Sequence, residues 1–261
     1  MTSTFKDIEF PSATEIEQQL QVPLLGCIEE VAPDGAADKL YPTEIFHYPV
    51  TRPSSRFSNS IGLLREAIQM IASGETSKKV ILITSTVSGE GKSTISCSIA
   101  TSAAQSGLSV LLIDGSVRNP KLSNRLRFLT PPGFAEVLSG TAAFERTLRK
   151  SADLGFTFLP GGTKALDPAT VLSSGRLKRV LENARAAFDF VVIDMPPAGL
   201  VPDAFVVSAL SDTLLYLWSP ATTPREAVCY TVKQLSRYKK ITGIAFNRGV
   251  LNASNCDFRL T

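Results

Sequence analysis

The chain has 261 residues, of which 44% are hydrophobic and 20% are charged, and its formal net charge is +3. This length and balance exclude a disordered chain and allow either one α/β domain or two small domains. Because the basic residues are scattered and are not interleaved with aromatic side chains, the charge indicates a solvated surface, and we expect no nucleic-acid partner.

Cysteine spacing and hydropathy exclude further classes of protein. The four cysteines of the chain stand far apart, without the spacing of a zinc site or of a disulfide framework. This cysteine usage fits a protein of a reducing compartment. The first ten residues carry charges where a signal peptide needs an apolar core. No apolar run approaches the roughly 20 residues that span a bilayer. We therefore expect a chain that is soluble by itself, so that any membrane role must come through a partner.

The first predicted elements are short. A serine followed three residues later by a glutamate forms a capping box, which predicts a helix over 13–20. A short strand is predicted over 23–28. Residues 29–56 hold many Pro, Gly and Asp without a clear period, so they are predicted as a long surface loop. Apolar residues at helical spacing then predict a helix over 57–73.

Apolar runs and helical stretches alternate from residue 80 onward. The runs are apolar throughout, which suits strands covered on both faces, and so predict an α/β fold with a doubly wound, mainly parallel sheet. The predicted strands lie at 80–83, 110–113, 156–159, 190–193, 213–217 and 241–246. The clearest helices lie at 93–106, 174–188 and 223–238.

The stretch TSTVSGEGKST, residues 84–94, follows the first of these strands. The phosphate-loop pattern GxxxxGK[ST] is met by Gly91, Lys92 and Ser93, and Gly89 adds backbone freedom, although Thr86 occupies the first glycine position. In this pattern backbone N–H groups surround the phosphates at a helix N-terminus. The alternative is a strand-to-helix turn that merely needs glycine, with Lys92 solvated.

Two further strands each end in a carboxylate, at Asp114 and at Asp194. Nucleotide-binding α/β sheets place their ligands at the carboxyl ends of the strands. An aspartate there can hold Mg²⁺ or orient a nucleophile. Each could instead cap the following helix or turn, but two of them in a chain that contains GEGKS favour a metal site.

Three segments together resemble a known family. TSTVSGEGKST, LLIDGSVRNPKL and FVVIDMPP are similar to the Walker A, A′ and B motifs of bacterial tyrosine kinases (BY-kinases). QQLQVPLLGCI, LPGGTKALDPATVLSSGRL and ITGIAFNRGV extend the resemblance over roughly 13–250. It implies a P-loop NTPase of the deviant Walker type that works with membrane polysaccharide co-polymerases in capsule and exopolysaccharide export.

The resemblance also implies roles for single residues. Lys92 would contact the β- and γ-phosphates, Thr94 would lie beside the α-phosphate, and Asn247 would read the adenine edge. Nucleotide binding falls to Ser88, Gly89, Glu90, Gly91, Lys92, Ser93, Thr94, Arg118 and Asn247. Catalysis falls to Lys92, Asp114 and Asp194, and Mg²⁺ binding to Ser93, Asp114 and Asp194. The implied cofactors are ATP and Mg²⁺.

The sequence departs from the family pattern at three places. Ser116 stands where the A′ motif has a second carboxylate, and a positioned general base is worth about 10²–10⁴ in rate. The last tyrosine is Tyr238, so the C-terminal tyrosine cluster that receives phosphate in the family is missing. Of the helix motif Glu-x-x-Arg-x-x-Arg, which helps family members form rings, only Arg65 remains.

We therefore predict an ATP-dependent enzyme, of tyrosine-kinase or ATPase type, that regulates exopolysaccharide or capsule polymerisation and export, with weak or absent tyrosine autophosphorylation. The resemblance implies an inner-membrane co-polymerase of the chain-length determinant type as partner and leaves a homo-oligomer open. It implies a cytoplasmic location, peripheral to the inner membrane through that partner or a fused membrane segment. We divide the chain into an N-terminal segment (1–56) packed on the main domain, a P-loop domain (57–250) and a flexible tail (251–261).

Two other functions stay open. A non-catalytic scaffold would use ATP to switch an interface of the co-polymerase, and Ser116 and the missing tyrosine cluster favour it. A partition or septum-positioning ATPase shares the fold, but those proteins carry a second lysine early in the phosphate loop, where this chain has Val87. Their membrane-bound members also end in a basic amphipathic helix, which NASNCDFRLT does not form.

Overall fold

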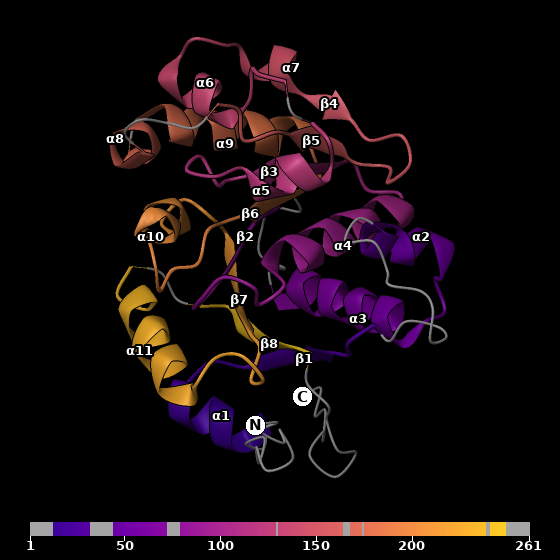
Figure 1. Cartoon of the computed structure of the whole chain (residues 1–261), viewed down its shortest axis with the longest axis vertical. Coiled ribbons are helices and arrows are strands. Elements are labelled where there is room, and N and C mark those ends of the chain that lie inside the picture. The colour runs from indigo at the N-terminus through magenta and orange to yellow at the C-terminus, as the bar shows by residue number, and fades with distance from the viewer. Residues whose placement is uncertain are drawn as a thin grey trace, which may run out of the picture.

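The computed structural model describes residues 13–31, 44–71, 79–128, 130–163, 168–173, 175–238 and 241–248. These ranges contain one eight-stranded sheet in the order β1-β8-β7-β2-β6-β3-β5-β4 (Figure 1). Neighbouring strands are parallel except β4 and β5, which are antiparallel. The strands are β1 (Leu24–Ile28), β2 (Lys79–Ser85), β3 (Val110–Asp114), β4 (Arg149–Lys150), β5 (Thr157–Leu159), β6 (Phe190–Asp194), β7 (Thr213–Trp218) and β8 (Gly243–Asn247).

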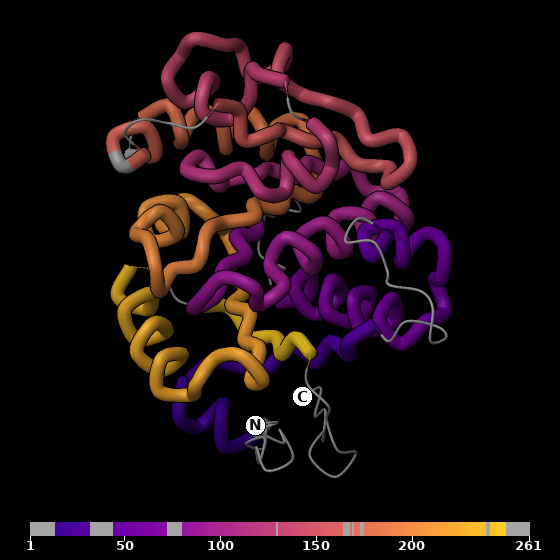
Figure 2. The backbone as a smooth tube through the Cα atoms, viewed as in Figure 1, coloured from indigo at the N-terminus to yellow at the C-terminus, as the bar shows by residue number. Residues whose placement is uncertain are grey.

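Helices cover both faces of the sheet, as the backbone trace shows (Figure 2). Helices α3 and α4 lie on one side of it and α10 and α11 on the other (Figure 1). The helices are α1 (Ala13–Leu20), η2 (Glu44–His47), α2 (Tyr48–Thr51), α3 (Arg56–Ile71), α4 (Lys92–Gln105), α5 (Lys121–Arg125), α6 (Phe134–Ser139), α7 (Phe144–Thr147), α8 (Pro168–Ser173), α9 (Gly175–Ala187), α10 (Asp203–Ser208) and α11 (Arg225–Leu235). The predicted doubly wound α/β fold is confirmed.

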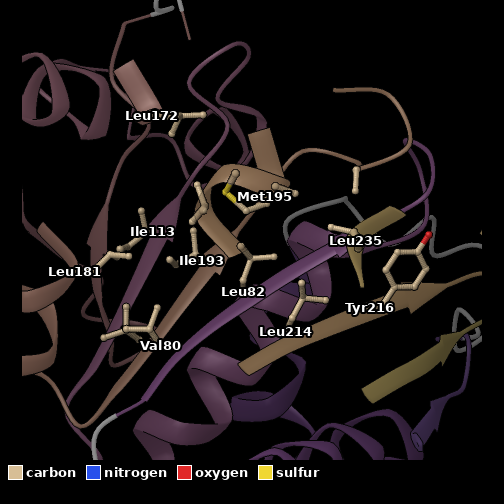
Figure 3. Packing of buried hydrophobic residues seen from close by; sticks show 14 of the residues in the cluster. Val80, Leu82, Ile113, Leu172, Leu181, Ile193, Met195, Leu214, Tyr216 and Leu235 are labelled. Carbon is tan, nitrogen blue, oxygen red and sulfur yellow. The ribbon is translucent and has the colours of Figure 1, made fainter. Parts of the chain in front are cut away.

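The apolar strands supply a core on each face. In β2, Val80 and Leu82 belong to one buried cluster, whereas Ile81 and Ile83 belong to the other. Alternate side chains of a strand point to opposite faces, so a strand that is apolar throughout fits only a sheet that is covered twice. Figure 3 shows the first cluster, in which Val80 and Leu82 lie with Ile193, Leu214 and side chains of the covering helices.

The predicted surface loop over 29–56 is wrong for residues 44–51. This stretch forms η2 and α2, and it buries the Phe46 and Tyr48 side chains in the second core cluster. Tyr48 packs edge-to-face on Phe57 of α3, with ring centroids 6.1 Å apart. Two helical pieces of four residues each are too short to give a helical period, and the prolines around them masked their helical character.

Other predicted elements agree with the structure within a few residues at their ends. Helices α1, α3, α4, α9 and α11 and strands β1, β2, β3, β5, β6, β7 and β8 were predicted, whereas the two-residue strand β4 was not. The predicted serine cap before α1, residues 72–73 of the third predicted helix and the predicted tail over 251–261 lie outside the described residues. The domain boundaries at 56 and 250 stay predictions.

The strand order brings distant segments of the chain to one edge of the sheet. Strand β6 lies between β2 and β3, and Asp194 at its end is in register with Ile83 on one side and with Asp114 on the other. The loops that follow these three strands therefore meet at their carboxyl ends, where open α/β sheets bind ligands.

Candidate nucleotide-binding site

The phosphate loop leaves β2 after Ser85 and turns directly into α4 at Lys92. Gly89 and Gly91 have φ angles of +90° and +91°, a region that side chains other than glycine rarely adopt. A Cβ at Gly91 would also lie 2.0 Å from Asn247 Nδ2. Glycine is therefore required at position 91 for two independent reasons, backbone conformation and space.

Buried contacts to neighbouring strands hold the loop in place. The Thr86 hydroxyl, at the position where the strict pattern has glycine, is hydrogen-bonded to the Tyr216 hydroxyl of β7. Glu90 is fully buried, and its carboxylate accepts hydrogen bonds from Val87 N, Ser219 N and Thr223 Oγ1 at 2.7, 3.2 and 2.7 Å. The sheet and the loop after β7 thus fix the main chain that would surround a phosphate.

Lys92 and Ser93 open the helix on the cavity side. Lys92 Nζ donates to Ser85 Oγ at 2.8 Å and to Val87 O at 3.2 Å. Burial lowers the pKa of Lys92, an effect opposed by the nearby carboxylates Asp194 and Glu90. Ser93 Oγ donates to Asp194 Oδ2 at 2.6 Å, so the Walker A hydroxyl and the Walker B carboxylate meet directly.

Asp194 receives a second hydroxyl from the same helix, Ser96 Oγ, at 3.3 Å from Oδ1. Burial raises the pKa of Asp194, while the hydrogen bond from Ser93 and the charge of Lys92 oppose the rise. A serine hydroxyl beside a carboxylate is the oxygen donor set that Mg²⁺ takes when it keeps several waters and phosphate oxygens. The described residues contain no group of three or more His, Cys, Asp or Glu with metal-site geometry.

Asp114 is held by its own segment of chain. Its carboxylate accepts from Ser116 N at 3.1 Å and from Ser123 N and Oγ at 2.8 and 2.7 Å. Burial and the neighbouring Asp194 raise the pKa of Asp114 to about 7. Ser116 Oγ donates to Asn119 O at 2.8 Å, so the residue that replaces the family carboxylate braces the turn.

These residues line one cavity of about 490 Å³. Of the predicted site residues, it includes Ser88, Gly89, Gly91, Lys92, Ser93, Thr94, Asp114, Arg118 and Asp194. Glu90 and Asn247 are not among the lining residues. They lie behind the loop, where Asn247 Nδ2 donates to Glu90 O at 2.9 Å. The predicted contact of Asn247 with the adenine edge stays a prediction.

Arg118 lines the cavity but is bound to α10. Its guanidinium makes a bidentate ion pair with Asp203, with distances of 2.8–3.0 Å, and Asp203 is buried. Bidentate pairing of this kind fixes the orientation of both groups. The pair therefore connects the segment after β3 to the segment after β6.

Several lining residues were missed by sequence reasoning. They are the cations Lys121, Arg125 and Arg248 and the apolar side chains Met195, Pro196, Pro197, Leu200 and Val201. Ser123, which joins Asp114 to Gly161 N at 2.9 Å, was missed as well. The available signal was the pair Lys121 and Arg125, because two cations four residues apart in a short helix lie on one face of it.

Comparison with known proteins agrees with this geometry. Residues 81–215 match the CobQ/CobB/MinD/ParA nucleotide binding domain. The match spans more than half of the chain, so the fold and the site define a nucleotide-binding P-loop domain of this class.

Relatives with a narrower description cover more of the chain. The tyrosine-protein kinase YwqD of Bacillus subtilis is 31% identical over 199 residues, which are 76% of this chain and 84% of that protein. The tyrosine-protein kinase CpsD of Streptococcus pneumoniae is 32% identical over 65% of this chain and 76% of its own length. The solved BceF tyrosine kinase domain superposes with a TM-score of 0.77 at 26% identity, covering 90% of this chain and 96% of that domain. The chain belongs to the bacterial tyrosine kinase family.

Proposed function

We propose that the chain binds Mg·ATP in the described cavity and acts as a BY-kinase-type ATPase that regulates capsule or exopolysaccharide polymerisation and export. One observation carries the proposal. A single cavity joins the phosphate loop, both strand-end aspartates and five cationic side chains, namely Lys92, Arg118, Lys121, Arg125 and Arg248. Backbone N–H groups, a lysine and arginines around one cavity are the donors that a nucleoside triphosphate requires.

The residues divide the expected chemistry among them. Mg²⁺ bound with the nucleotide would polarise the phosphoryl group that is transferred. Ser93 and Asp194, already 2.6 Å apart, would hold it, and Lys92 would neutralise the outer phosphates. Asp114, fixed by Ser116 N and Ser123, would orient the attacking hydroxyl or water with its carboxylate. In phosphoryl transfer, such positioning and charge stabilisation supply almost all of the rate enhancement.

The first experiment follows the γ-phosphate. The purified chain, Lys92→Ala and the matched control Lys178→Ala are incubated with γ-labelled Mg·ATP, and label is measured as free phosphate and on tyrosine. Lys178 is exposed on α9, where it faces Glu182, so its loss should change nothing. We expect label to leave ATP with the wild type and the control and to stay on ATP with Lys92→Ala. Equal release by all three chains would overturn the assignment of this cavity.

Tyrosine labelling is expected to be weak or absent. Among the described tyrosines, Tyr230 and Tyr238 are exposed at 68% and 62%, whereas Tyr48 and Tyr216 are buried. A label that enters a described tyrosine should therefore be on Tyr230 in α11 or on Tyr238 after its end. Replacement of both by phenylalanine should remove it in a background in which Tyr41, which lies outside the described residues, is also phenylalanine. Label that persists in the resulting variant contradicts this mapping.

A scaffold that binds ATP without turnover is the second candidate, and Ser116 favours it. The Ser116 side chain is engaged with Asn119 O and supplies no carboxylate beside Asp114. Ser116→Asp tests the choice, because a restored base should raise turnover by about 10²-fold or more if the site is built for catalysis. ATP that stays intact with both chains, while nucleotide binding is retained, would support the scaffold.

The partner we propose is an inner-membrane polysaccharide co-polymerase, which would hold the chain at the cytoplasmic side of the membrane. None of the helices in the described ranges has the length and apolar character that crossing a bilayer requires. Co-purification with the co-polymerase from membranes, compared between the wild type and Lys92→Ala with and without ATP, tests both the partner and its control by nucleotide. Recovery that is independent of the co-polymerase contradicts the proposal.

A further inference from the structure

Arg125 is a cationic side chain that lines the cavity, and it lies in none of the motifs identified in the sequence. It is the last residue of the short helix α5 and lines the cavity together with the phosphate loop. Its Nη1 lies 3.3 Å from Thr94 Oγ1, in the first turn of α4. The guanidinium therefore reaches across from the segment after β3 to the helix that the phosphate loop opens.

The aromatic ring of Phe46 packs against the guanidinium of Arg125. Arg125 Cζ lies 4.3 Å from the centroid of the Phe46 ring, and Phe46 is fully buried. A cation at this distance over a ring is attracted by the ring electrons, and more strongly where water is excluded. Phe46 belongs to η2, the element that sequence reasoning placed in a surface loop. The N-terminal part of the chain thus supplies a rigid support for a cation of the cavity.

Arg125 and Lys92 approach the first turn of α4 at different residues. In a phosphate loop the lysine reaches the β- and γ-phosphates, the next hydroxyl serves Mg²⁺, and the backbone N–H groups surround the α- and β-phosphates. Arg125 approaches Thr94, which is one residue deeper in α4 than the hydroxyl of Ser93. A guanidinium there would face the inner phosphates of a nucleotide held by the loop, and its planar set of five N–H donors matches phosphate oxygens.

We propose that Arg125 is a phosphate-binding residue that contacts the inner phosphates of the nucleotide and is positioned by Phe46. The inference rests on the proposed binding of ATP in this cavity. Burial lowers the pKa of Arg125, and the charge of Asp194 opposes that effect. Because the ordinary pKa of a guanidinium lies far above neutral pH, the side chain still carries its charge. Lys92 would contact the β- and γ-phosphates, of which the γ-phosphate is lost in the reaction. Arg125 would contact the inner phosphates, which ATP and ADP have in common.

The test compares ATP with ADP. Dissociation constants of both nucleotides are measured by calorimetry on the full chain, on Arg125→Met, which keeps an apolar stem over Phe46, and on Arg179→Met, an exposed arginine of α9 that serves as control. We expect Arg125→Met to weaken ATP and ADP by a similar factor of about 10- to 100-fold, the range of a charged hydrogen bond. Lys92→Ala should weaken ATP more than ADP, and Arg179→Met should change neither.

Two further variants separate binding from folding. Arg125→Lys keeps a charge and should recover part of the lost affinity for both nucleotides. Phe46→Leu keeps buried apolar volume but removes the ring, and should weaken both by about 2- to 5-fold. If Arg125→Met lowers only the melting temperature, with both dissociation constants unchanged, Arg125 is structural and the inference is wrong. If Lys92→Ala also leaves the dissociation constants unchanged, the proposed function itself fails, so the two failures are distinguishable.

Discussion

The cavity has two walls that are built differently. We call residues 86–94 the P-loop wall and residues 114–125 the A′ wall. Buried side chains from other elements tie the P-loop wall to the sheet: Tyr216 is hydrogen-bonded to the Thr86 hydroxyl, and Asn247 donates to the main-chain oxygen of Glu90. The A′ wall has bonds among its own residues, from Ser123 to Asp114 and from Ser116 to Asn119, besides the Arg118–Asp203 pair and the contact of Arg125 with Phe46.

The difference explains where this chain departs from its family. A loop that other elements fix cannot change one residue without moving several contacts. Thr86, which departs from the strict pattern, has its own such contact, a hydrogen bond between its hydroxyl and that of Tyr216. A wall held by local side chains can exchange one for another. Ser116 replaces a carboxylate and still braces the turn through Asn119 O. Substitutions should therefore cost more in the P-loop wall than in the A′ wall. Gly91→Ala and Arg118→Ala test this difference, and two serines of α4, which lie outside both walls, set the scale of a small effect.

The largest effect is expected for Gly91→Ala in the P-loop wall. The new Cβ would combine a strained φ with a contact to Asn247 Nδ2 at 2.0 Å, and we expect a loss of about 3 kcal/mol in the free energy of unfolding. Gly89→Ala has the same strain but no atom within 4 Å, so about 1 kcal/mol should be lost. Urea denaturation of both variants measures the difference, and equal losses would mean that the contact with β8 is unimportant.

A medium effect is expected for Arg118→Ala in the A′ wall. Its removal leaves the buried carboxylate of Asp203 without its cation, and we expect a loss of about 2 kcal/mol. Asp203→Ala should cost less, because the side chain of Arg118 is 35% exposed and can be hydrated. Denaturation of the two single variants and of the double variant gives the coupling. A larger loss for Asp203→Ala would contradict this account. The same variants test the predicted role of Arg118 in nucleotide binding.

The smallest effect is expected between two serines of α4. Ser96 donates to Asp194 over 3.3 Å, so Ser96→Ala should lower stability by about 1 kcal/mol. Ser98 Oγ is buried and has no hydrogen-bond partner among the described residues. Ser98→Ala should therefore leave stability unchanged or raise it by up to about 1 kcal/mol. Melting temperatures rank the pair, and a greater loss for Ser98→Ala than for Ser96→Ala would contradict this account.

Sequence patterns predicted those parts of the molecule whose structure depends on residues that are close together in the sequence. Continuous apolar runs define the parallel strands, because a strand between two helical layers buries both of its faces. The phosphate loop and the two strand-end aspartates were predicted for the same reason, since each follows directly from the strand before it. Their convergence on one cavity followed from the expected topology.

Contacts between distant segments could not be predicted in the same way. The sequence around η2 does not indicate that the Phe46 ring packs against Arg125. The sequence around Glu90 does not indicate that its carboxylate accepts hydrogen bonds from Ser219 N and Thr223 Oγ1. The short helices α5 and α10, which carry Arg125 and Asp203, span five or six residues, too few to show a period. The residues that sequence reasoning missed are therefore concentrated in short elements and in the partners of buried polar groups.

The pairing of β1 with β8 has a consequence for the order of folding. Leu24 and Ile244 are neighbours in the sheet although almost the whole described chain separates them. During synthesis β1 leaves the ribosome long before β8 exists, and pairing between segments so far apart closes a very long loop. That edge of the sheet must therefore form late. Until then Ile28, which is fully buried in the finished fold, is exposed to aggregation or to capture by a chaperone.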